Sequence, residues 1–89
     1  MSIRVLLADD HGVVRKGLRF LLERQPDMEI VGEAADGREA VRLAEAANPD
    51  IVIMDIAMPL LNGIEATAQI VKRNPGIAVI ILSVHSDED

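Results

Sequence analysis

The sequence predicts a doubly wound α/β fold, in which helices cover both faces of a parallel β-sheet. Two observations support this fold class. Short apolar runs without polar alternation recur along the chain, as is typical of strands covered on both faces. Segments with helical periodicity separate these runs, and the connections between them are short. We therefore expect the order β-α-β-α-β-α-β, with right-handed crossovers between parallel strands.

The first predicted strand is Ile3–Ala8 (IRVLLA), and it ends at Asp9 and Asp10. The segment from Val13 to Gln25 has the periodicity of an amphipathic helix, with charged residues at the other positions. Pro26 ends this helix. Its expected apolar face consists of Val14, Leu18, Leu21 and Leu22.

The second predicted strand, from Glu29 to Ala35, has the weakest pattern because half of it is polar and it contains Gly32. Such a strand belongs at the edge of a sheet. Asp36 is a good N-cap for the next helix, which runs to about Ala47 and stops before Pro49. The expected buried face of this helix consists of Ala40, Leu43, Ala44 and Ala47.

The third predicted strand, Ile51–Met54, is wholly apolar and leads directly to Asp55. Pro59 marks a turn after it, and a third helix opens at Gly63 and ends at the Asn-Pro-Gly sequence before residue 77. We expect the buried face of this helix to consist of Ile64, Ala68 and Val71. The fourth strand is predicted at Ile77–Leu82, and Ser83 follows it.

Length and composition restrict the function. The 89 residues allow one small domain, and the 49% of apolar residues favour a packed core. The net charge of −6 disfavours binding to a nucleic-acid backbone. Cysteine is absent, which excludes disulfides and thiolate metal sites. No apolar run approaches the ~18 residues of a membrane span, so we expect no membrane partner and a cytoplasmic location.

Polar residues follow three of the four predicted strands. Because the carboxyl ends of parallel strands share one edge, Asp9, Asp10, Asp55 and Ser83 are expected to meet there. Asp50 is expected at the opposite edge, since five residues of extended chain separate it from Asp55 by about 16 Å. Ligands of open α/β sheets bind at the carboxyl edge. The sequence therefore predicts a binding site around these carboxylates.

Converging carboxylates repel one another, which raises the pKa of at least one of them unless a cation neutralises the charge. Ligand sets made only of oxygen favour Mg²⁺ or Mn²⁺ over Zn²⁺. A cation beside a carboxylate also suits phosphoryl transfer, so Asp55 is a candidate nucleophile that would form an aspartyl phosphate. A structural alternative stays open, in which Asp9 or Asp10 caps the first helix and Asp55 begins a turn. His11 beside Asp10 suggests a metal or acid–base role, but we predict instead a solvent-facing residue at the start of that helix.

These residues match the pattern of a known family. The acidic pair Asp9-Asp10 follows the first strand, Asp55 follows the third, and Ser83 follows the fourth. Met58, Pro59 and Gly63 have the spacing D-x-x-M-P-x-x-x-G. The chain thus resembles the CheY-like receiver domain of two-component response regulators, which has a flavodoxin-like fold. The stretches ADDHGVVRKGL, GEAADGREAV and ILSVHSDE resemble the NarL/FixJ subfamily, whose members usually carry a LuxR-type DNA-binding domain.

The resemblance implies a role for each matching residue. Asp55 would accept a phosphoryl group from a sensor histidine kinase. Asp10, Asp55 and the backbone carbonyl of Ala57 would bind Mg²⁺ directly, and Asp9 would act through water. Ser83 would report the phosphoryl group as a switch residue, whereas Met58, Pro59 and Gly63 are expected to be structural. The resemblance implies a phosphoacceptor and not a conventional enzyme, although the family assists its own phosphotransfer and dephosphorylation.

The chain also departs from the family, whose sheet has the order 2-1-3-4-5. A fourth helix, a fifth strand with a phosphate-pairing lysine, and a fifth helix have no counterpart here, and Lys16 and Lys72 are not placed to substitute. We therefore expect a truncated receiver of strand order 2-1-3-4 that contacts DNA only through an effector domain absent from this sequence. The last strand, Ile77–Leu82, would then be an exposed edge through which the chain self-associates. An inert or structural fragment without phosphotransfer stays an alternative.

Two other classes that share this architecture fit less well. A flavodoxin-like cofactor binder needs a Ser-, Thr- or Gly-rich loop after the first strand, where its backbone N–H groups bind phosphate. Here that loop carries Asp9 and Asp10, which repel an anion. A haloacid-dehalogenase-type phosphatase would place a second Asp two residues after the nucleophile, where this chain has Ala57.

Overall fold

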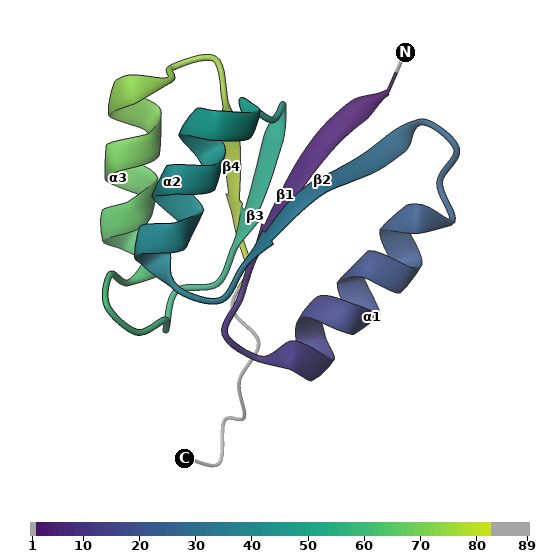
Figure 1. Cartoon of the computed structure of the whole chain (residues 1–89), viewed down its shortest axis with the longest axis horizontal. Coiled ribbons are helices and arrows are strands. Elements are labelled where there is room, and N and C mark those ends of the chain that lie inside the picture. The colour runs from purple at the N-terminus through teal and green to yellow at the C-terminus, as the bar shows by residue number, and fades with distance from the viewer. Residues whose placement is uncertain (1, 83–89) are drawn as a thin grey trace.

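The structure, a computed structural model, describes residues 2–82. Strands and helices alternate along this part of the chain, which confirms the predicted order (Figure 1). Ser83 and His85 lie outside the described residues, so their predicted placement is untested. The elements are β1 (Ile3–Ala8), α1 (Gly12–Glu23), β2 (Met28–Ala34), α2 (Gly37–Ala47), β3 (Ile51–Met54), α3 (Gly63–Arg73) and β4 (Ala78–Ile81).

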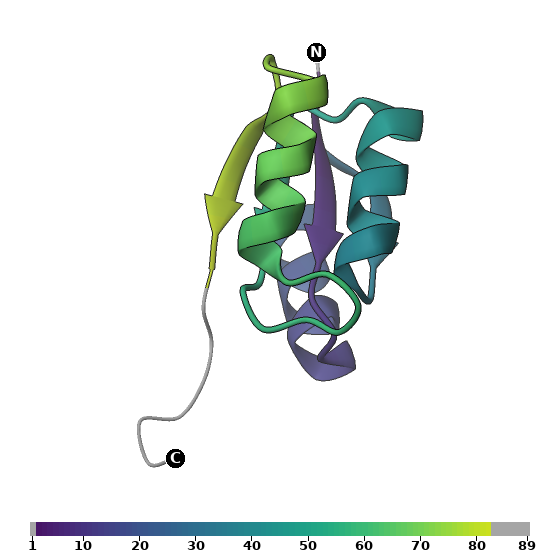
Figure 2. The ribbon, with the colours of Figure 1, turned by 90° about the vertical axis from the view of Figure 1, so that its left-hand side faces the viewer.

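The four strands form one sheet of order β2-β1-β3-β4, in which every pairing is parallel. This is the predicted order 2-1-3-4, and the half-polar strand β2 lies at an edge as expected. Helices α2 and α3 cover one face of the sheet, and α1 lies against the other (Figures 1 and 2). Together the helices and the sheet form the doubly wound arrangement predicted from the sequence.

The core lies mainly between the sheet and the helices α2 and α3. Strand β1 runs through the middle of the sheet, and its residues from Val5 to Ala8 are at most 1% exposed. Ala40 and Ala44 of α2 are fully buried, as the pattern of this helix predicted. Small alanine side chains let the helix approach the sheet closely. Aliphatic residues therefore fill the core, and the single aromatic residue, Phe20, is 62% exposed.

Helix α1 is the least covered of the three helices, and none of its residues is buried. Three of its four predicted core residues are partly covered, but Leu21 is 60% exposed, so the prediction was wrong at that position. The helix packs mainly against β2 and β1, at one side of the sheet. A helix in this position packs against one layer, the sheet. The part of the helix that the sheet covers is narrower than the apolar face predicted from the sequence.

The buried face of helix α3 differs from the predicted one. Ile64 is 56% exposed and Val71 is 42% exposed, whereas Ala66 and Ile70 are buried. The sequence places apolar residues on two faces of this helix, and periodicity alone did not identify the packed face. Gly63 marks the packed face, because this buried glycine lies against the backbone after β3. Ala66 and Ile70 follow it at helical spacing and therefore face the core as well.

Side chains cap both helices of the packed layer. The Asp36 carboxylate accepts a hydrogen bond from the Glu39 backbone N–H at 2.8 Å, which confirms the predicted N-cap. Asn62 accepts one in the same way from Glu65 at the start of α3, at 2.9 Å. Among residues 2–82, no helix has the length and apolar character that crossing a lipid bilayer requires.

Candidate functional site

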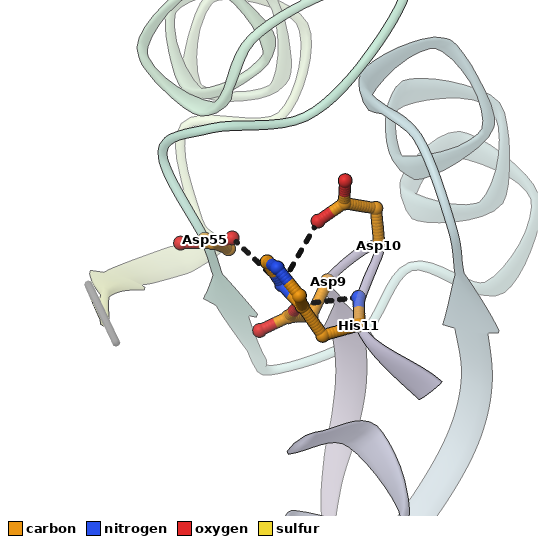
Figure 3. A group of neighbouring side chains, drawn as sticks. All are labelled: Asp9, Asp10, His11 and Asp55. Carbon is orange, nitrogen blue, oxygen red and sulfur yellow. Dashed lines mark hydrogen bonds and ion pairs between the residues drawn. The ribbon is translucent and has the colours of Figure 1, made fainter. Parts of the chain in front are cut away.

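The predicted carboxylate cluster forms at the carboxyl edge of the sheet. Asp9 and Asp10 directly follow β1, and Asp55 directly follows β3 (Figure 3). The two strands pair in parallel with Ala8 opposite Met54, so the acidic residues after them are neighbours. One ligand atom from each of the three carboxylates and from His11 lies within 4.8 Å of the others. The expected convergence of these aspartates is confirmed.

The carboxylates differ in burial. Asp9 and Asp55 are only 3% and 5% exposed, whereas the side chain of Asp10 is one-third exposed. Burial raises the pKa of Asp55, and the charges of Asp9 and Asp10 raise it further. A hydrogen bond from the Ile56 backbone N–H to Asp55 Oδ1, at 2.9 Å, acts in the opposite direction. The repulsion between carboxylates that the sequence predicts therefore contributes to the raised pKa of Asp55.

Asp9 is held from three sides. Its Oδ1 accepts a hydrogen bond from the His11 backbone N–H at 2.7 Å, and its own N–H donates to Ala34 O at 3.0 Å. Its carbonyl oxygen accepts a hydrogen bond from Arg15 Nη1 at 2.6 Å. Arg15 also pairs with Glu33 of β2, with its Nε 3.2 Å from the carboxylate. Helix α1 and strand β2 thus fix the backbone that carries the buried carboxylate.

Gly63 fixes the backbone that carries Asp55. Its N–H donates to the Ile56 carbonyl at 2.7 Å. A Cβ atom at this position would lie 2.0 Å from the Asp55 carbonyl oxygen, which no side chain can tolerate without backbone movement. The predicted structural role of Gly63 therefore has a specific cause, since only glycine lets α3 begin directly over the end of β3.

The rest of the loop between β3 and α3 is anchored to the core and to α2. Met58 is 8% exposed and belongs to the core, while Ala57 beside it is exposed. The Pro59 carbonyl accepts hydrogen bonds from Leu61 N–H at 2.7 Å and Gly37 N–H at 3.4 Å. Leu60 adopts a positive φ of 69°, and this left-handed residue completes the turn that the proline predicted. These contacts therefore fix the backbone of the loop that carries Ala57, two residues after Asp55.

His11 lies in the site, although the sequence analysis preferred a solvent-facing position to a metal or acid–base role. Its side chain is 55% exposed, so the expected solvent-facing position is correct, but its ring also lies among the carboxylates (Figure 3). Its Nδ1 is 2.9 Å from Asp9 Oδ1, 3.1 Å from Asp10 Oδ1 and 3.8 Å from Asp55 Oδ2. The hydrogen bond to Asp9 and the charge of Asp10 raise the pKa of His11. Its place directly after the acidic pair was the available signal.

The opposite edge of the sheet carries the aspartate that the sequence analysis excluded. Asp50 Oδ2 accepts a hydrogen bond from the Arg4 backbone N–H at 2.8 Å, near the start of β1. Strand direction thus separates this structural carboxylate from the cluster, as predicted. The cluster itself offers a hard divalent cation several carboxylate oxygens close together, two of the carboxylates being buried. The donor set therefore fits such an ion.

Comparison with known proteins agrees with this geometry. Over 87 residues the chain is 51% identical to the transcriptional regulatory protein LiaR of Bacillus subtilis, covering 98% of this chain and 41% of that protein. The chain thus spans about two fifths of the length of such relatives. The response regulator domain of Thermotoga maritima CheB superposes with a TM-score of 0.89 at 47% identity, over 93% of this chain and 61% of that one.

A second similar structure is a CheX–CheY–BeF₃–Mg²⁺ complex from Borrelia burgdorferi, with a TM-score of 0.85 at 31% identity. It covers 97% of this chain and 66% of that one. The family model of the response regulator receiver domain matches residues 5–89. With the strand order, the acidic edge and this match in agreement, the chain belongs to the response regulator receiver domain family.

Proposed function

We propose that Asp55 accepts a phosphoryl group from a sensor histidine kinase in a reaction that depends on Mg²⁺. Membership in the receiver family makes the chain part of two-component signalling. The observation that carries the finer proposal is the position of Asp55, a buried carboxylate with a raised pKa that faces two further aspartates at the carboxyl edge. A cation bound beside Asp55 would relieve the repulsion among these carboxylates, and phosphoryl transfer uses a cation in this position.

The chain's own residues would position the acceptor. The Ile56 N–H holds Asp55 Oδ1, and Asp55 Oδ2 faces the cluster. In the proposed transfer, an Asp55 oxygen forms a bond to phosphorus while the bond from phosphorus to the kinase imidazole breaks, and that imidazole leaves with the bonding electron pair. The chain acts as a phosphoacceptor that assists its own phosphorylation and dephosphorylation, and not as a conventional enzyme.

Asp10, Asp55 and the Ala57 carbonyl would hold the cation directly, and Asp9 would hold it through water. When bound, Mg²⁺ or Mn²⁺ would neutralise the negative charge on the phosphoryl and carboxylate oxygens. The presence of Mg²⁺ in the similar CheX–CheY complex supports the choice of ion. Ser83 remains the proposed switch residue.

Incubation with acetyl phosphate and Mg²⁺, followed by intact mass spectrometry, tests the proposal. The chain should gain one phosphoryl group, and Asp55→Asn should gain none. Asp50→Asn is the matched control, because it changes an aspartate at the opposite edge whose acceptor role an amide oxygen can keep. A phosphorylated Asp55→Asn variant would refute the proposed acceptor. A folded chain that binds Mg²⁺ but gains no mass would favour the inert fragment.

We further propose that phosphorylation normally controls a linked DNA-binding domain in transcription. The name of LiaR as a transcriptional regulatory protein supports this role, and it is a role of a longer protein than this chain. The flavodoxin-like cofactor binder is not favoured, because the loop after β1 presents Asp9 and Asp10 where that class needs anion-binding N–H groups.

A further inference from the structure

We propose that His11 is an additional ligand of the divalent ion and shifts the preference of the site from Mg²⁺ toward first-row transition ions such as Co²⁺. This inference rests on the cation site of the proposed function, and it adds a nitrogen donor to a ligand set that otherwise consists of oxygen. The consequence concerns which ion the site takes up, which can be measured without any phosphoryl transfer.

The distances around the His11 ring are those of neighbouring ligands. In octahedral coordination with bonds of about 2.1 Å, adjacent ligand atoms lie about 3.0 Å apart and opposite ones about 4.2 Å apart. Nδ1 is 3.1 Å from Asp10 Oδ1, close to the adjacent separation. Its 2.9 Å contact with Asp9 Oδ1 is a hydrogen bond to the residue that would hold the ion through water. Its 3.8 Å distance to Asp55 Oδ2 lies between the two values. The ring nitrogen is therefore already within the space that a shared ion requires.

The local backbone directs the ring to this place. His11 is the N-cap residue of α1, yet its side chain makes no capping hydrogen bond to the helix. Its backbone N–H instead donates to Asp9 Oδ1, the same oxygen that Nδ1 contacts. The main chain and the ring of one residue thus converge on one buried carboxylate. Because the side chain is 55% exposed, the ring can adjust to an entering ion without disturbing the core.

The chemistry of the donor predicts the preference. Imidazole nitrogen binds Co²⁺, Ni²⁺ and Zn²⁺ well, whereas Mg²⁺ prefers oxygen and retains water in its coordination sphere. Transition ions bind most N- and O-donor sites more tightly than Mg²⁺ does, so their affinity alone does not identify a histidine ligand. The discriminating quantity is the change that a His11 substitution causes for each ion.

Calorimetric titrations with MgCl₂ and CoCl₂ provide this test, on the wild-type chain and on His11→Gln. His11→Gln should weaken Co²⁺ binding at least about tenfold and Mg²⁺ binding less than about twofold. Asp50→Asn is the control, since it changes an aspartate at the opposite edge of the sheet and should change neither affinity. Circular dichroism checks that each variant is folded. The Co²⁺-loaded wild type should also show a paramagnetically shifted imidazole proton in its NMR spectrum, absent from His11→Gln.

Equal losses of Co²⁺ and Mg²⁺ affinity in His11→Gln, or an unchanged Co²⁺ affinity, would overturn the assignment. The same titrations separate this inference from the proposed function. If Asp55→Asn leaves Mg²⁺ affinity unchanged, the proposed cation site is wrong, whatever His11 does. If Asp55→Asn abolishes Mg²⁺ binding while His11→Gln shows no selective loss of Co²⁺, the cation site stands and only the His11 assignment fails.

Discussion

At the scale of single residues, the carboxyl edge shows a conflict between charge and burial. Asp55 is buried beside the ionised groups of Asp9 and Asp10, and its pKa is raised as a result. His11 offsets part of this charge from the solvent side. An edge that served stability alone would carry less negative charge. The carboxylate cluster therefore lowers the stability of the fold in order to form a binding site.

The charge conflict predicts that Asp55→Asn stabilises the chain when metal is removed with EDTA. The pKa of Asp55 is higher in the folded than in the unfolded state, so ionisation at neutral pH destabilises the fold. The neutral amide avoids this cost. The melting temperature of Asp55→Asn should exceed that of the wild type at neutral pH, and the difference should shrink as acidification protonates Asp55. A lower melting temperature for the variant at neutral pH would contradict the prediction.

A second residue-scale prediction concerns Gly63→Ala. The added Cβ would lie 2.0 Å from the Asp55 carbonyl oxygen, so the backbone after β3 must move. We expect a loss of at least about 2 kcal/mol in the free energy of unfolding, measured by urea titration, because overpacking against backbone is poorly relieved. Gly17→Ala is the control, since a Cβ atom there would meet nothing within 4 Å, and it should stabilise α1 by about 0.5–1 kcal/mol. Equal stability of the two variants would refute this account.

At the scale of elements, ordinary helix signals position the loops that form the site. Helix α2 begins at the Asp36 cap, and its first residue, Gly37, donates a hydrogen bond to the Pro59 carbonyl in the loop that follows Asp55. A Cβ atom on Gly37 would lie 1.6 Å from the Leu61 carbonyl oxygen. The start of α2 therefore supports the loop after β3, although neither segment is near the other in the sequence.

Removal of the α2 cap should destabilise the fold in proportion to one lost hydrogen bond. Asp36→Ala leaves the Glu39 N–H without its 2.8 Å acceptor, so we expect a cost of about 1 kcal/mol in the free energy of unfolding. Asp36→Ser should recover most of it, because serine also accepts this bond. Chemical denaturation of the three proteins measures the difference. A cost shared equally by both variants would indicate that the charge of Asp36, and not its cap, matters.

At the scale of the whole molecule, the sheet has two different edges in the described part of the chain. Strand β2 carries Glu29 and Glu33, whereas β4 is wholly apolar and its Ile80 and Ile81 are 51% and 37% exposed. An apolar edge strand offers unpaired backbone groups and hydrophobic surface to another chain. These observations support the proposal that the chain self-associates through the segment Ile77–Leu82, which includes β4.

A charge on β4 should therefore weaken self-association. Light scattering across a concentration series should show a mass for the wild type that rises with concentration, and Ile80→Lys should shift this rise to higher concentration. Ile64→Lys is the matched control, because Ile64 is a similarly exposed isoleucine, at 56%, on the outer face of α3. A monodisperse monomer for the wild type at every concentration would rule out the proposal.

The sequence predicted most of the fold because several local signals agreed. A β-favouring run interrupted only by Arg4 identified β1, and an unbroken apolar run identified β3, both with their observed bounds; Asp36 marked the start of α2. The face of α3 was predicted wrongly, since Ile64 and Ala66 lie on different sides of a helix that is apolar on both. Leu21 was predicted wrongly because local periodicity does not reveal how much of a helix its neighbours cover.

The sequence by itself determined the alternation of strands and helices and the edge at which the aspartates meet, because parallel strands bring their carboxyl ends together whatever the details of packing. The order of the strands within the sheet was implied by the resemblance to the receiver family. Only the tertiary structure decided that the His11 ring joins those aspartates and that Gly63 lies on the Asp55 backbone. These contacts depend on the parallel register between β1 and β3 and on the rotation of a helix. Both are fixed by packing between segments far apart in the chain, which no local pattern records.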